Sequence, residues 1–284
     1  MNRMLVTFAV ALTMAGVAQG VPQGGAQKEI VIKDKAEAAA YRAADSTADP
    51  AAKAAAMEAF SKRYPKSAVY VDALEQAMAA YQQTGNMDKV EEIAGQILGA
   101  NPDNIRALAI VCLLDRTKAA QGSADALKAT GEYCAKGLQA LPKWQKPDDM
   151  ADQLFKLMHD QTWAIFNGGS GFAALQRKDY VAARDFYLQA LQVDSYDVIN
   201  NYQISLAYFS MEPMDPVGIW YATVAGHVAR GKGEPAGEQI LAFAKSKYVK
   251  YHGSEDGWFE FSTSKDIMRT TPPNPLGIKP APAP

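Results

Sequence analysis

The sequence has few of the side chains that most catalytic and metal sites need. It contains three histidines, His159, His227 and His252, and two cysteines, Cys112 and Cys134. The histidines do not occur in an HExxH or other two-histidine spacing, and the cysteines do not form a CxxC pair, which argues against a zinc or redox centre. A Gly-x-Ser-x-Gly nucleophile elbow is also missing. We therefore expect no enzyme, no cofactor and no bound metal.

The chain also lacks a strong net charge and, beyond its N-terminus, a long apolar run. Its 29 basic and 31 acidic residues give a formal net charge of -2, so no overall field would draw it to nucleic acid or an anionic membrane. No apolar run after the N-terminus approaches the ~18 residues of a membrane-spanning helix. With 48% apolar and 21% charged residues, the chain is expected to fold around a substantial core.

The first twenty residues have the pattern of a cleaved secretory signal. Arg3 precedes an apolar run of about 14 residues, which as a helix would span only about 21 Å. Small residues Ala18 and Gly20 follow, two positions apart, and an uncleaved membrane anchor is the alternative interpretation. We expect a signal at 1–20, a flexible leader at 21–33, and an exported chain, in a bacterial periplasm or secreted, with no stable membrane insertion after cleavage. No cysteine lies near the cleavage point, so a lipid anchor is not supported.

In an oxidising compartment Cys112 and Cys134 could form one disulfide bridge. The two residues fall on the predicted antiparallel helices of one pair, and bonding requires Cα atoms within about 7 Å. The alternative is that both are small buried residues at a helix-packing interface. The sequence leaves the choice open.

Apolar residues at three- and four-residue spacing predict consecutive helix pairs between residues 34 and 230, with a capping helix at 235–251. Asp49-Pro50 and Ser123 provide helix starts, and Gly85 suits the left-handed position after a helix. A short helical segment is expected at 252–269 and a proline-rich flexible tail at 270–284. Trp144, in a linker, either plugs the space between repeats or is an exposed contact.

The run Gly168-Gly-Ser-Gly171 is not typical of a phosphate-binding loop. It follows a helical segment instead of a strand, and it lacks the Gly-Lys-Ser/Thr ending. The glycines either let two helices approach closely or kink one helix.

The segment 178–195 resembles the second half of a tetratricopeptide repeat, a helix-turn-helix unit of about 34 residues. The matching residues are Asp179, Tyr180, Ala183, Tyr187, Ala190, Leu191 and Asp194. Ser195 stands where proline is usual. The resemblance covers roughly residues 34 to 230 and implies an all-α, right-handed superhelical solenoid of about five antiparallel helix pairs, completed by the capping helix at residue 251. Residues 59–67 also resemble a short sequence segment of exported repeat proteins such as the outer-membrane assembly factor BamD. BamD-like proteins carry a lipidated cysteine, which this sequence lacks.

The resemblance implies a binding scaffold whose concave groove holds a protein or peptide segment. The process it implies is the assembly or maintenance of the cell envelope. The groove residues it implies are Asp72, Glu75, Gln82, Arg106, Arg116, Phe172, Tyr202 and Phe209. Each could instead be a solvated or packing residue, because exposed and buried positions differ by one helical step. The alternatives are an envelope enzyme on a helical-repeat scaffold and a self-associating structural component, and the sequence leaves the partner and the oligomeric state open.

Overall fold

The described part of the chain is built from helices. The computed structural model describes residues 32–148 and 150–281, and within these ranges it has twelve α-helices and no strand. This confirms the all-helical prediction. The predicted signal and residues 21–31 of the predicted leader lie outside the described residues. The described chain divides into two compact units, residues 32–169 and 170–281, and the boundary falls inside helix α7 (Asp152–Gln176).

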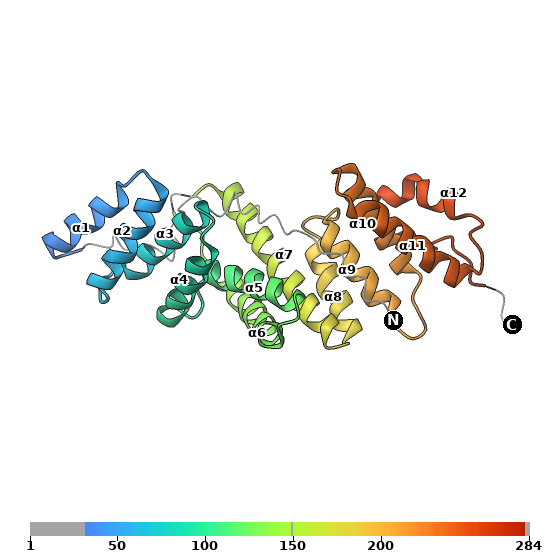
Figure 1. Cartoon of the computed structure of the whole chain (residues 1–284), viewed down its shortest axis with the longest axis horizontal. Helices are drawn as coiled ribbons and strands as arrows, with labels where there is room; N and C mark the ends of the chain where they lie inside the picture. Colours follow the sequence, from blue (N-terminus) through green and yellow to red (C-terminus); the bar gives the residue numbers. More distant parts are fainter. Residues whose placement is uncertain (1–31, 149, 282–284) are drawn as a thin grey trace. The chain divides into compact units, whose positions relative to one another are not determined.

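Six consecutive helices form most of the first unit, and each packs against the next (Figure 1). Their bounds are Lys35–Asp45 (α1), Pro50–Arg63 (α2), Tyr70–Gln83 (α3), Met87–Ala100 (α4), Ile105–Ala120 (α5) and Ala124–Ala140 (α6). Side-chain oxygens of Asp49, Asn86 and Ser123 accept backbone N–H groups at the starts of α2, α4 and α6. Asp49 and Ser123 are the caps expected from the sequence. Consecutive packing of this kind is compatible with a helical repeat.

The core of the first unit contains the apolar stripes that the sequence predicts for α3 and α4. Of the eight residues that the helical spacing places in these stripes, Tyr81 is half-buried and seven are buried: Leu74, Ala77, Met78, Val90, Ile93, Ala94 and Ile97. Leu74 and Ile93 belong to one cluster with Ile110 of α5, so a single apolar layer joins three helices. Burial of a side chain of this size contributes roughly 1.5–3 kcal/mol. Packing of these stripes therefore holds α3, α4 and α5 together.

A disulfide joins α5 to α6 inside the first unit. Cys112 and Cys134 are both fully buried, and their Cα atoms lie 5.4 Å apart. Of the two interpretations that the sequence leaves open, the structure has the bridge. The side chains also share a cluster with Phe166 of α7.

Glycines bring helix α7 into close contact with its neighbours. A Cβ atom on Gly169 would lie 2.3 Å from Cys134 Sγ and 2.7 Å from Cys112 Sγ, and a Cβ atom on Gly137 of α6 would lie 2.3 Å from the Phe166 ring. Helix α7 continues through the glycine run without interruption. The run therefore serves close packing and does not end or break the helix.

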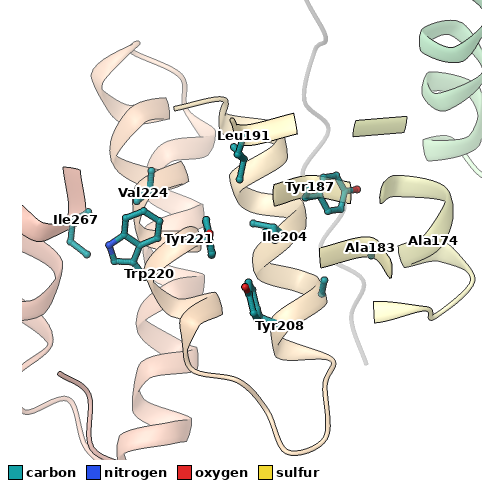
Figure 2. Packing of buried hydrophobic residues seen from close by; sticks show 11 residues of the cluster. Ala174, Ala183, Tyr187, Leu191, Ile204, Tyr208, Trp220, Tyr221, Val224 and Ile267 are labelled. Carbon is teal, nitrogen blue, oxygen red and sulfur yellow. The ribbon is translucent and has the colours of Figure 1, made fainter. Parts of the chain in front are cut away.

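The second unit contains the end of α7 and five further α-helices, followed by a 3-10 helix. Their bounds are Tyr180–Leu191 (α8), Val198–Phe209 (α9), Val217–Gly231 (α10), Ala236–His252 (α11), Trp258–Thr263 (α12) and Lys265–Met268 (η2). Figure 2 shows the main core of this unit, in which Trp220 of α10 lies near Ile267 and Tyr221 lies on the side of Ile204. The Trp220 indole Nε1–H donates to the carbonyl of Asp266, 3.1 Å away. These contacts fix η2 against α10.

The described part of the proline-rich tail contacts helix α11. The Ala281 N–H donates to the carbonyl of Tyr251 at 2.8 Å, and His252 Nδ1 lies 2.8 Å from the carbonyl oxygen of Lys279. Leu276 packs against the main core of the unit. The tail up to residue 281 has no regular secondary structure, as its prolines require.

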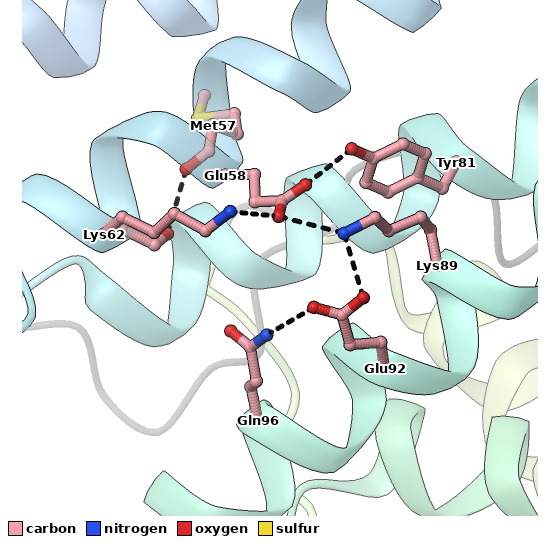
Figure 3. A network of polar contacts seen from close by, with 8 residues as sticks. Met57, Glu58, Lys62, Tyr81, Lys89, Glu92 and Gln96 are labelled. Atoms are coloured by element: carbon pink, nitrogen blue, oxygen red, sulfur yellow. Dashed lines mark hydrogen bonds and ion pairs between the residues drawn. The ribbon is translucent and has the colours of Figure 1, made fainter.

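A polar network centred on Glu58 connects α2, α3 and α4 (Figure 3). The Glu58 carboxylate accepts hydrogen bonds from Lys62 at 2.6 Å, Tyr81 at 2.6 Å and Lys89 at 3.1 Å. The hydrogen bond from Lys62, followed by that from Tyr81, lowers the pKa of Glu58 to about 2, against the opposing effect of burial. Lys89 also binds Glu92. The ionised carboxylate thus stabilises the contact between three consecutive helices.

The Glu58→Gln variant is expected to lose about 1–2 kcal/mol of unfolding free energy at pH 7, because charge-assisted hydrogen bonds become neutral ones. Because the folded-state pKa lies below the ordinary value of 4.5, this stabilisation is present above pH 4.5 and is lost as the pH falls towards 2. Urea unfolding of both proteins between pH 7 and 2 measures the difference. Glu132→Gln, which changes an exposed ion pair with Lys128, is the control and should have little effect. A pH-independent difference for Glu58→Gln would contradict the prediction.

Candidate functional site

Two charged residues expected in a groove of the first unit bind each other instead. Glu75 of α3 and Arg106 of α5 are each only 4% exposed, and Arg106 Nη1 lies 3.5 Å from a Glu75 carboxylate oxygen. Asn104 Nδ2 donates to the other oxygen at 2.5 Å. Burial raises the pKa of Glu75, while Arg106 and Asn104 act in the opposite direction. Both side chains are buried and link α3 to α5, and their assignment to a groove stays a prediction.

The remaining polar groove candidates of the first unit, Asp72, Gln82 and Arg116, are half-buried. Asp72 accepts hydrogen bonds from the hydroxyl of Tyr41 and from Gln76 Nε2, the latter at 3.1 Å. Burial, followed by the hydrogen bond to Asp72, raises the pKa of Tyr41. Asp72 thus links α1 to α3, while Gln82 and Arg116 lie on α3 and α5.

The aromatic groove candidates lie in the second unit, where two of them meet the same ring. Phe172 of α7 is 4% exposed and Tyr202 of α9 is 8% exposed, so both are mainly packing residues. Phe209, at the end of α9, is half-buried. The ring of Phe243, on α11, lies 6.0 Å from that of Tyr202 and 5.7 Å from that of Phe209, measured between centroids.

A lysine completes this arrangement. The Nζ atom of Lys247 on α11 lies 5.2 Å from the centroid of Phe209 and 5.2 Å from that of Phe243. We call Tyr202, Phe209, Phe243 and Lys247 the aromatic face. Cation–π attraction at this distance stabilises the ammonium only in part. Burial, followed by the charge of Lys250, lowers the pKa of Lys247.

Helical spacing explains how these side chains come together. Tyr202 and Phe209 are seven residues apart, about two turns, and Phe243 and Lys247 are four apart, so each pair occupies one face of its helix. Gly218 of α10 lets Phe209 approach, because a Cβ atom at this position would lie 2.8 Å from the Phe209 ring. Sequence reasoning assigned α11 only a capping role and so missed Phe243 and Lys247. Their four-residue spacing was the signal available.

Comparisons with known proteins do not assign the chain to a family. No family model matches it. No curated protein matches it either. The aromatic face and its surroundings therefore provide the basis for a functional proposal.

The aromatic face offers ring surface and one cation. Within residues 32–148 and 150–281, no group of three histidine, cysteine, aspartate or glutamate side chains could hold a metal ion. In the same ranges, no helix is both long and apolar enough to cross a membrane.

Proposed function

We propose that this chain is an exported scaffold of the tetratricopeptide-repeat type that binds a protein or peptide segment in the cell envelope. In this proposal the helices form a right-handed solenoid of about five pairs, and the aromatic face of the second unit is the main contact. The half-buried pair of Phe209 and Phe243 is the observation that carries the proposal. Aromatic residues contribute a disproportionate share of binding energy at protein interfaces.

The packing of the best repeat match supports the repeat architecture. Ala183, Tyr187 and Ala190, which carry the resemblance, are at most 1% exposed. Small residues and one large aromatic at these positions allow α8 to pack closely on its neighbours, and a Cβ atom on Gly171 would lie 3.0 Å from the Tyr187 ring. Helix pairs of this kind need neighbours on both sides to bury their apolar faces. The consecutive helix packing of both units agrees with that requirement.

The disulfide supports export. Disulfides form and persist in oxidising compartments such as the bacterial periplasm and are rare in the cytosol. Cys112 and Cys134 are the only cysteines of the chain, and the described structure bonds them to each other in the core. This agrees with the secretory signal that the first twenty residues predict.

Selection of linear peptides from a displayed library on the purified full chain tests the proposal. The Phe209→Ala/Phe243→Ala variant is expected to bind the selected peptides at least about 30-fold more weakly, because two anchor rings are lost. Phe259→Ala, which removes a 72% exposed ring on α12 outside the aromatic face, is the matched control and should bind normally. Helical circular dichroism must be retained in both variants. Selected peptides that bind the double variant as tightly as the original chain would refute the proposal.

A further inference from the structure

We infer that the aromatic face accepts an acidic segment, in which a glutamate or aspartate pairs with Lys247 while a nearby apolar side chain covers Phe209 and Phe243. This inference rests on the proposed function and specifies the chemistry of the partner. It starts from the position of Lys247, whose ammonium lies 5.2 Å from both ring centroids.

The ammonium of Lys247 has no acidic partner in the described chain. The charged residue that acts on it most clearly is Lys250, which has the same sign. Lys245, two positions earlier on α11, differs in this respect because it pairs with Glu255. A partly desolvated cation without a counter-charge gains more from an incoming carboxylate than a fully hydrated one does.

The helices around the aromatic face favour an acidic ligand. Helix α9 has no charged side chain at all, and α10 carries only Arg230 and His227 as ionisable groups apart from its buried tyrosine. Helix α11 carries three lysines and one glutamate, Glu238, in its first turn. Because Lys245 and Arg230 are paired with Glu255 and Glu238, an acidic segment would be attracted mainly by Lys247 and Lys250, whereas a basic one would be repelled there.

The rings determine the second half of the ligand. Phe209 and Phe243 are half-buried and meet edge to face, with 76° between their planes. A carboxylate alone would leave this ring surface in contact with water, while an apolar side chain beside it would cover it. In an extended peptide, residues two apart project from the same side at a spacing of roughly 7 Å. We therefore expect the acidic and apolar residues to be two positions apart.

Three ten-residue fluorescein-labelled peptides test the inference on the full chain by fluorescence anisotropy. The first has phenylalanine and glutamate two positions apart, separated by serine, and the others have glutamine or lysine in place of glutamate. The glutamate peptide should bind at least about tenfold more tightly than the glutamine peptide, and the lysine peptide should bind most weakly. Lys247→Met, which keeps the apolar stem, should remove this preference. Lys250→Met, an exposed lysine on the same helix, should preserve it.

The outcomes separate this inference from the proposed function. If the glutamate and glutamine peptides bind equally, or if Lys247→Met retains the preference, the acidic-segment inference is wrong. Should the Phe209→Ala/Phe243→Ala variant still weaken binding in that case, the proposed function stands. Failure of the glutamate peptide to bind also overturns the inference. Binding that is insensitive to loss of both rings overturns the proposed function as well.

Discussion

Replacing Trp220 with alanine is expected to lower the unfolding free energy by about 3–5 kcal/mol. Trp220 is 1% exposed and packs against Tyr221, with 4.9 Å between ring centroids. Alanine would leave a cavity at the centre of the second unit and remove the hydrogen bond to the Asp266 carbonyl. It would thereby also loosen η2, whose Ile267 lies in the same core. Because domains are stable by only about 5–15 kcal/mol, this change should remove a large part of the total.

Urea unfolding followed by circular dichroism measures this loss. Phe259→Ala is the control, because its ring is largely exposed and surface substitutions usually change stability by less than about 0.5 kcal/mol. A loss below about 1 kcal/mol for Trp220→Ala would show that the core around α10 does not depend on the indole.

Reduction of the Cys112–Cys134 disulfide should lower the unfolding free energy by about 3 kcal/mol. The two cysteines are 22 positions apart, and a loop of this length corresponds to roughly that value when the constraint on the unfolded chain is removed. Because both sulfurs are buried in the described structure, the reductant should act slowly on the native protein and readily after partial unfolding.

Urea unfolding with and without a phosphine reductant tests this prediction, and thiol titration confirms the redox state of each sample. The Cys112→Ala/Cys134→Ala variant is the control, because its stability should not respond to the reductant. Equal midpoints for the oxidised and fully reduced original chain would contradict the expected contribution of the bridge.

Local signals allowed most helices to be predicted from the sequence. Asp49 before Pro50 and Ser123 before Ala124 are short-range N-cap signals, and the structure places helix starts at both sites. The stripe that includes Leu74 and Met78 gave the buried face of α3 because apolar residues at this spacing share one side of a helix. These features depend on a few neighbouring residues, so no knowledge of distant contacts was needed.

The candidate site was less predictable, because it depends on contacts between distant segments. Glu75 follows Asp72 by less than one turn, yet it faces Asn104 and Arg106 of α5 and is buried. Nothing within α3 distinguishes this orientation from an exposed one. Likewise, the bridge between Cys112 and Cys134 depends on a Cα separation set by the packing of two helices. Phe243 could be assigned to the aromatic face only once α11 was seen beside α9.

The contact of Gly169 with the disulfide links the evolution of positions that are distant in the sequence. While Cys112 and Cys134 remain bonded, even one added methyl group at position 169 would collide with sulfur. A relative that had lost both cysteines would have room for alanine there, whereas a relative that keeps them should retain glycine. Joint occurrence of the cysteine pair with this glycine is therefore a signature by which diverged members of the lineage could be recognised when overall similarity has faded.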